Sequence, residues 1–167
     1  MISTEWRRLS PEIKSKLGEL QKNAPVPLGK LANEMGLKVL SATLPAGVSG
    51  ELRPDQGVYV VKVNRHDSKA RQRFTVAHEV AHFLLHKDHI GDGIRDDALY
   101  RSTLSDAREA EANRLAADLL MPMALLKPAY ERAITDCEGD VAARLAKEFG
   151  VSEVAMKLRL EQLRGGP

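Results

Sequence analysis

Apolar positions recur at helical spacing along most of the chain, and residues that start or stop helices bound these stretches. Ser10 precedes Pro11 in the arrangement of an N-cap followed by proline at the first helical position. Gly36 and Gly150 follow apolar stretches and are typical helix stops. Helices are predicted over about residues 11–20, 28–35, 68–86, 106–120, 123–135, 140–149 and 152–163.

The segment between the second and third predicted helices has the alternation of strands instead. Strands are predicted over residues 37–43, 50–53 and 58–63, with turns at 45–50 and 54–57. Neighbouring strands joined by short turns favour a small antiparallel sheet. Residues 88–103 are rich in glycine and aspartate and are predicted to form a long loop. The order of helices, sheet and helices predicts an α+β fold.

One predicted helix carries the sequence His78-Glu79-Val80-Ala81-His82. Residues four apart lie on one face of a helix, so the two imidazoles can meet a single zinc ion. Glu79 points to a different side and is placed to act as general base on a water molecule. The motif is surrounded by small and apolar residues, and a buried helix face does not carry two histidines and a glutamate without a partner. The sequence therefore predicts one catalytic zinc ion.

A catalytic zinc site needs a third protein ligand. The metzincin pattern would place glycine at 85 and histidine at 88, but the chain has Leu85 and Asp88. His86 is one further turn from His82, about 12 Å along the axis from His78, which is too far to share the ion. His86 is therefore interpreted either as a residue that supports the site or the substrate, or as a plain surface histidine.

Two carboxylates on the next helix compete for the place of third ligand. Glu109 shares its helix face with small residues, which would let this helix approach the metal helix closely. Glu111 shares a more mixed face and is interpreted as a solvated or salt-bridging residue. A carboxylate on a small-residue face needs a positive partner, so Glu109 is the favoured ligand. Asn113, one turn on, is a candidate to hold a histidine ring by a hydrogen bond.

Composition excludes several other classes of protein. The only cysteine, Cys137, rules out a disulfide framework and a thiolate zinc site, and its acidic neighbours argue against a redox switch. With 25 Lys and Arg against 23 Asp and Glu, the net charge of +2 argues against a protein that coats nucleic acid or an anionic membrane. No secretory signal and no apolar run of membrane-spanning length is visible, so a cytoplasmic location is expected.

The last two predicted helices have the spacing that is typical of a helix-turn-helix, with Gly150 at the end of the first and Ser152 at the start of the second. The second of them carries the basic residues Lys157, Arg159 and Arg164. DNA binding is one interpretation. The favoured one is a helical cap that packs on the peptidase or grips its target, because three glutamates lie nearby. The chain is accordingly divided into a zinc metallopeptidase domain, 1–122, and a helical, helix-turn-helix-like segment, 123–167.

Residues 73–86 (RFTVAHEVAHFLLH) and 109–122 (EAEANRLAADLLMP) together resemble the ImmA/IrrE family of metallopeptidases. The resemblance extends over nearly the whole chain. It implies a zinc-peptidase helical core of the gluzincin type, with His78, His82 and Glu109 as zinc ligands and Glu79 as the catalytic residue. It also implies a protein substrate, namely a helix-turn-helix repressor or antitoxin of the kind found in stress responses and toxin–antitoxin-like operons.

Three questions stay open at the level of the sequence. An oxyanion-stabilising donor is expected, and Tyr100, His86 and His89 are the candidates. The strand at 58–63 is either core sheet or an edge that binds extended substrate. Finally, the alternative to an endopeptidase is a non-proteolytic zinc-containing regulatory or DNA-binding protein that acts through its C-terminal segment.

Overall fold

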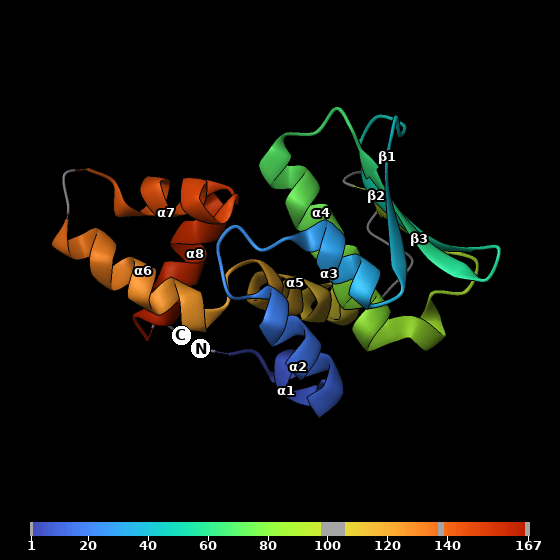
Figure 1. Ribbon diagram of the computed structural model, residues 1–167. Coiled ribbons are helices and arrows are strands. Elements are labelled where there is room, and N and C mark those ends of the chain that lie inside the picture. The colour runs from blue at the N-terminus through green and yellow to red at the C-terminus, as the bar shows by residue number, and fades with distance from the viewer. Residues whose placement is uncertain (1, 98–105, 137–138, 166–167) are drawn as a thin grey trace.

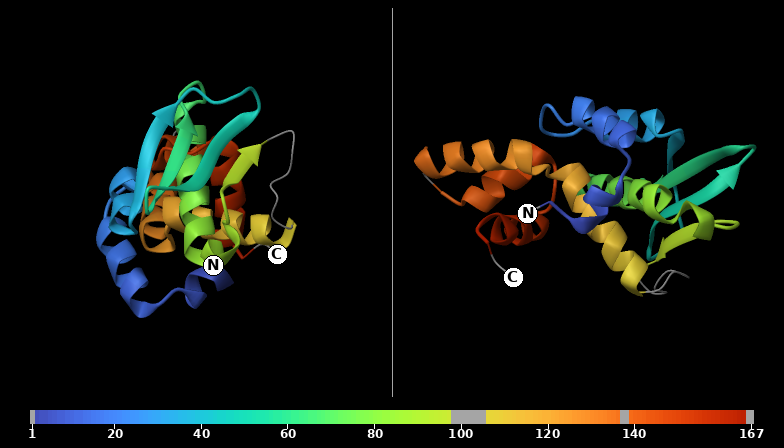
Figure 2. Two further views of the ribbon diagram at one scale, coloured as in Figure 1. Left: turned by 90° about the vertical axis from the view of Figure 1, so that its right-hand side faces the viewer. Right: turned by 90° about the horizontal axis from the view of Figure 1, so that it is seen from below.

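The computed structural model describes residues 2–97, 106–136 and 139–165, so Tyr100 and Cys137 lie outside the described residues. The fold is mixed α+β. The sheet and the C-terminal helices lie at opposite ends of the molecule, and two crossing helices, α4 and α5, fill the space between them (Figures 1 and 2). The N-terminal helices cover one side of this central pair.

The helices lie close to where their capping residues predict them. They are α1 (Thr4–Arg8), α2 (Pro11–Leu20), α3 (Leu28–Glu34), α4 (Lys69–His86), α5 (Asp106–Leu120), α6 (Met123–Thr135), α7 (Val141–Phe149) and α8 (Glu153–Leu163). Ser10, Ser68 and Ser152 each accept a backbone N–H of the first turn through the side-chain oxygen. Gly150 ends α7 at φ +65°, a left-handed conformation that favours glycine. Helix α1 was not predicted.

The four-stranded sheet has the order β1-β3-β2-β4. Its strands are β1 (Leu37–Ala42), β2 (Val48–Asp55), β3 (Val58–Asn64) and β4 (Ile94–Asp97). Strand β3 is antiparallel to β2 but parallel to β1. The predicted small antiparallel sheet is therefore wrong for the β1–β3 pair, and the sheet is mixed.

The end of β3 explains this arrangement. The backbone N–H of Arg65 donates to Ala42 O at 2.8 Å, and the side-chain amide of Asn64 donates to Val48 O at 2.9 Å. These two bonds fasten the end of β1 and the start of β2 to either side of β3. The connection between Ala42 and Val48 is long enough to step over β3, since two strand spacings are only about 10 Å. Because β3 is paired on both sides, it has no free edge for a substrate, and that interpretation of residues 58–63 is wrong.

Two predicted irregular segments hold regular structure. The turn predicted at 45–50 ends earlier, because β2 begins at Val48. The loop predicted at 88–103 contains a short 3-10 helix, η1 (Lys87–His89), and strand β4, which pairs with β2. Glycine and aspartate mask this strand in the sequence, and its pairing partner lies more than forty residues earlier.

Two arginines fasten the C-terminal helices to the central pair. Arg73 on α4 donates to three carbonyl groups, those of Val26 at 3.0 Å, Gly150 at 3.0 Å and Phe149 at 3.4 Å. Arg159 on α8 forms a buried ion pair with Asp118 of α5. The division into two units at residue 122 stays a prediction. Within the described ranges, no helix is long and apolar enough to cross a membrane.

Candidate metal centre

Three predicted ligand residues meet where α4 crosses α5. The Nε2 atoms of His78 and His82 and the carboxylate of Glu109 lie within 4.8 Å of one another. His78 Nε2 is 2.9 Å from His82 Nε2, and the Glu109 oxygens are 3.3 Å and 3.2 Å from these two nitrogens. Both histidines are buried, whereas a quarter of the Glu109 side chain is exposed. One side of the cluster therefore faces solvent.

These separations fit a tetrahedral zinc site. Ligand bonds of about 2.0–2.2 Å at tetrahedral angles place neighbouring donor atoms about 3.3–3.6 Å apart. The observed separations of 2.9–3.3 Å are slightly shorter, so a small outward movement of the side chains accommodates an ion. Burial lowers the pKa of His82 below its ordinary value, which favours the neutral imidazole that binds a metal.

Local helix packing explains why these groups converge. Ala77 and Ala81 on α4 and Ala112 and Ala116 on α5 are completely buried, and such small side chains let two helix axes approach closely. Glu109 lies in the first turns of α5, where the helix dipole favours a negative charge. Ala112 and Ala116 belong to the small-residue face of α5 that favours Glu109 over Glu111 as the third ligand.

Glu79 lies on another side of α4, against strand β2. Its side chain is fully buried, and a Cβ placed on Gly50 would lie 3.2 Å from Glu79 Oε1 and 2.3 Å from Thr75 Cγ2. Only glycine lets β2 pass this close to the helix. The pairing of β2 with β4 is irregular at Ser49, the neighbour of Gly50, where the register shifts. Sequence reasoning missed Ser49 and Gly50, although a glycine inside a strand is a signal of such a contact.

His86 belongs to a chain of side chains that supports His82. Its ring is buried, with His86 Nδ1 at 3.2 Å from His82 Nδ1 and His86 Nε2 at 2.8 Å from Glu111 Oε2. Arg8 of α1 donates to the other oxygen of Glu111 at 2.7 Å. If His82 uses Nε2 for a metal, its Nδ1–H donates to His86, and His86 Nε2–H then donates to Glu111. The hydrogen bond from His86 lowers the pKa of Glu111 below its ordinary value.

These contacts decide two of the open interpretations. His86 supports a candidate ligand and is not a plain surface histidine, because it is buried and its two ring nitrogens contact His82 and Glu111. Glu111 is a salt-bridging residue, as predicted. Its ion-pair partners among the described residues are Arg8 and His86, and its charge also acts on Arg114, its neighbour on α5. His89 is exposed on η1. The oxyanion donor stays unassigned.

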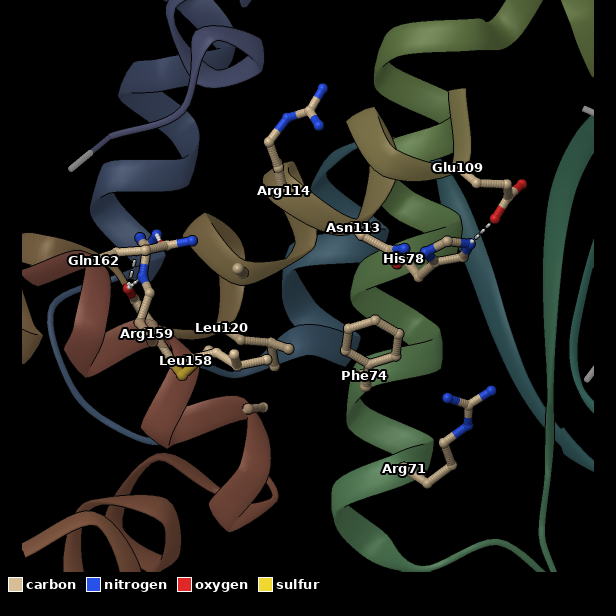
Figure 3. Close-up of a pocket in the computed structure, with 13 residues that line it drawn as sticks. Arg71, Phe74, His78, Glu109, Asn113, Arg114, Leu120, Leu158, Arg159 and Gln162 are labelled. Atoms are coloured by element: carbon tan, nitrogen blue, oxygen red, sulfur yellow. Dashed lines mark hydrogen bonds and ion pairs between the residues drawn. The ribbon is translucent and has the colours of Figure 1, made fainter. Parts of the chain in front are cut away.

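The face of α4 that leads to the cluster carries two residues that sequence reasoning did not single out. The ring of Phe74 stacks on the ring of His78, with centroids 5.8 Å apart, and the guanidinium of Arg71 lies 5.7 Å from the Phe74 centroid (Figure 3). Asn113 faces the same space from α5 and is exposed. No hydrogen bond joins Asn113 to a histidine ring in the part of the chain that the structure describes, so that expectation is wrong.

Comparison with known proteins identifies a similar fold and a family. The chain is similar, with a TM-score of 0.62 and 20% identity, to the solved structure of a Mycobacterium tuberculosis transcriptional regulator. The likeness covers 90% of this chain and 45% of that regulator, so the chain spans about half of its length. No protein of curated function matches. Residues 32–161 match the family of the IrrE N-terminal-like domain, Peptidase M78, so the chain belongs to this metallopeptidase-like family.

Proposed function

We propose that the chain is a zinc-dependent endopeptidase. The observation that carries this proposal is the convergence of two imidazole nitrogens and one carboxylate on a single point that is open to solvent on one side. Two histidines with one carboxylate are a common ligand set of catalytic zinc in hydrolases. Membership of a family that is typically metal-dependent supports the same conclusion.

The residues divide the work of peptide hydrolysis between them. His78, His82 and Glu109 would hold the ion, which, when bound, lowers the pKa of water and polarises a peptide carbonyl. Glu79 accepts the proton of the attacking water and passes it to the leaving amine nitrogen. Its complete burial between α4 and β2 keeps the carboxylate in a fixed position. His86 and Glu111 keep the ring of His82 in the orientation that presents Nε2 to the ion.

A helix-turn-helix repressor or antitoxin is the proposed substrate, as the resemblance to ImmA/IrrE proteins implies. The alternative is a non-proteolytic, zinc-containing regulatory or DNA-binding protein that acts through its C-terminal segment, and the M. tuberculosis structure of similar fold is named a transcriptional regulator. The surroundings of the basic residues on α8 speak against this alternative. Arg159 is buried against Asp118, Arg164 stacks on Tyr130, and Lys157 lies near Asp140 and Glu153.

Sequencing the neighbouring genes shows whether one of them encodes a helix-turn-helix regulator, and incubation of the zinc-loaded chain with that regulator tests the proposal. We expect a defined cleavage that mass spectrometry locates, that a chelator abolishes and that added zinc restores. Glu79→Gln should bind zinc as the wild type does but cleave at least about 100-fold more slowly. Glu12→Gln, in an exposed ion pair on α2, is the matched control and should cleave normally. Cleavage by Glu79→Gln at the wild-type rate would show that Glu79 is not the general base.

A further inference from the structure

A cleft runs from the candidate metal centre toward the C-terminal helices. Its volume is about 520 Å³, within the range of ligand-binding pockets, and α4, α5 and α8 form its walls (Figure 3). His78 and Glu109 line one end. A second hollow of about 260 Å³ continues it along α8 and shares Phe74, Leu120 and Leu158 with it. We call the two hollows together the α4–α8 cleft.

The middle of the α4–α8 cleft is apolar and open. Phe74 of α4, Leu120 of α5, and Ala155 and Leu158 of α8 line both hollows, as does Arg71 of α4, whose guanidinium lies over the Phe74 ring. Leu158 is 57% exposed and Val154, which lines the second hollow, is 68% exposed. Among the described residues, these are the two most exposed large hydrophobic side chains. A single exposed leucine needs no explanation, but here both lie on one cleft that begins at a candidate catalytic centre.

We propose that the α4–α8 cleft binds the polypeptide substrate on one side of the scissile bond and takes a bulky aliphatic or aromatic side chain between Phe74, Leu120 and Leu158. This inference rests on the proposed endopeptidase function. A peptide whose carbonyl lies at His78 and Glu109 extends by about 3.3–3.6 Å per residue, so its next residues enter this cleft. Leu158 would thereby determine specificity, and α8 would serve the enzyme as a wall of the substrate site.

The polar groups of the cleft suit a peptide as its occupant. Asn113 lies exposed between the metal-ligand end and the apolar part, where its amide can donate to a peptide carbonyl and accept from a peptide N–H. The guanidinium of Arg159, which also lines the cleft, is bound to Asp118 and to Met121 O. The exposed side chains that α8 presents here are those of Val154, Leu158 and Gln162, an aliphatic surface with one amide, which suits an apolar side chain of a peptide. Of the arginines that line the cleft, Arg114 is paired with Glu5 and Arg71 donates to Ser49.

Cleavage profiling tests the specificity. The zinc-loaded chain is incubated with a library of peptides, and mass spectrometry identifies the residues on each side of the cut. We expect Leu, Ile, Met or Phe to be enriched at one position next to the cut. Leu158→Lys should lower kcat/KM for such peptides by about tenfold and weaken the enrichment. Ile134→Lys alters an aliphatic residue of α6 that is 49% exposed and outside the cleft, and it should change neither quantity.

A second experiment measures binding without cleavage. The Glu79→Gln variant, labelled at its leucine methyl groups, is titrated with alanine-based peptides that carry one central Leu, Phe, Ser or Asp. We expect the Leu and Phe peptides to shift the methyl signals of Leu120 and Leu158 more than the Ser and Asp peptides do.

The two experiments separate the failure of one proposal from that of the other. Cleavage without an apolar preference, or with a preference that Leu158→Lys leaves intact, overturns the assignment of the cleft and leaves the endopeptidase standing. Methyl shifts in Glu79→Gln together with no cleavage by the zinc-loaded wild type overturn the endopeptidase, and they support the cleft only as a binding site for apolar side chains of a peptide. Equal shifts with the Leu and Ser peptides overturn the cleft, as would self-association of the chain that Leu158→Lys abolishes.

Discussion

His86 lies between a candidate metal ligand and a carboxylate that is itself held by an arginine. Its Nδ1 is 3.2 Å from His82 Nδ1, and its Nε2 is 2.8 Å from Glu111. Two imidazoles in series with a carboxylate extend the usual arrangement, in which one carboxylate or carbonyl orients a ligating histidine. The ring of His86 is therefore expected to fix both the tautomer and the orientation of His82.

Replacement of His86 tests this positioning role. We expect His86→Ala to weaken zinc binding by about 10–100-fold, because Nδ1–H of His82 loses its acceptor. Competition with a chromophoric chelator measures the affinity directly. His89→Ala removes an exposed histidine three residues away and should leave it unchanged. Equal affinities in the two variants would mean that His86 serves only as packing.

Gly50 allows a test of the close contact between β2 and α4, because a side chain at this position would collide with one identified atom, Thr75 Cγ2. Gly50→Ala should destabilise the fold by about 1–3 kcal/mol, since its Cβ would lie 2.3 Å from Thr75 Cγ2. Thr75→Ser removes that methyl group, so the double variant should recover most of the loss in chemical denaturation. A double variant no more stable than Gly50→Ala would place the strain elsewhere, for instance at Glu79.

Helix α1 is attached to α5 by an ion pair whose strength depends on pH. Arg114 donates to Glu5 Oε1 through Nε at 3.1 Å and through a terminal nitrogen at 2.7 Å. Burial alone raises the pKa of Glu5, but the hydrogen bonds, that from Arg114 foremost, outweigh it and leave the pKa below its ordinary value of 4.5. A carboxyl group with a lowered pKa in the folded state stabilises the fold above its unfolded pKa, and the gain is lost as the pH falls through the folded pKa.

We therefore expect Glu5→Gln to lower the free energy of unfolding by about 1 kcal/mol at pH 7. The value is modest because half of the Arg114 side chain is exposed, so solvent screens the pair. The difference from the wild type should shrink as the pH falls below about 4.5, as denaturation at a series of pH values would measure. A difference that is constant between pH 7 and pH 3 would contradict the assignment. Glu12→Gln, on the exposed surface of α2, is the control.

The elements differ in how well the sequence predicts them. Helices α2, α4 and α6 lie within a residue or two of their predicted bounds, because caps and apolar spacing are local signals. The parallel pairing of β1 with β3 has no local signal: it depends on Asn64 and Arg65, which bind backbone groups on both sides. Local alternation predicts a strand but not its neighbour, which is why the mixed sheet and β4 were missed.

The residues of the candidate site also differ in how well the sequence predicts them. His78 and His82 belong to one helix, so their spacing alone brings them together. Glu109 could be chosen because a face of small residues indicates a close helix crossing. Phe74 and Leu158 line one cleft although they are distant along the chain, and the same is true of the hydrogen-bonded pair Arg8 and Glu111. No pattern within one segment of the sequence indicates these contacts. Sequence reasoning therefore predicted the proposed ligands and offered His86 and Glu111 in supporting roles, but it did not indicate Arg8, Phe74 or Leu158.

At the scale of the whole molecule, the candidate site connects the two central helices on which the other elements pack. An ion that binds the folded chain and not the unfolded one stabilises it by mass action. We expect zinc at 100 times its dissociation constant to add about 2.7 kcal/mol, or on the order of 5–10 °C in the melting temperature of a chain of this size. Thermal unfolding with zinc and with a chelator measures this shift.

Two variants separate the ligands from the general base in that measurement. Glu79→Gln should keep the zinc-dependent shift, because Glu79 is not among the proposed ligands. His78→Ala should lose most of it. A shift of wild-type size in His78→Ala would mean that zinc binds elsewhere on the chain, and the proposed centre would then be wrong.

The side chain of Arg73 holds α4 at a fixed distance from the turn between α7 and α8, next to the α4–α8 cleft. One guanidinium extends from α4 to the carbonyls of Phe149 and Gly150 at the turn that leads into α8, and a side chain on Gly150 would collide with it. Of the two arginines that hold α8 against the central helices, Arg159 lines the cleft, whereas Arg73 lines neither of its hollows. Substitutions at Arg73 could therefore change the size of the substrate side chain that the cleft accepts, while every residue of the candidate catalytic centre stays the same.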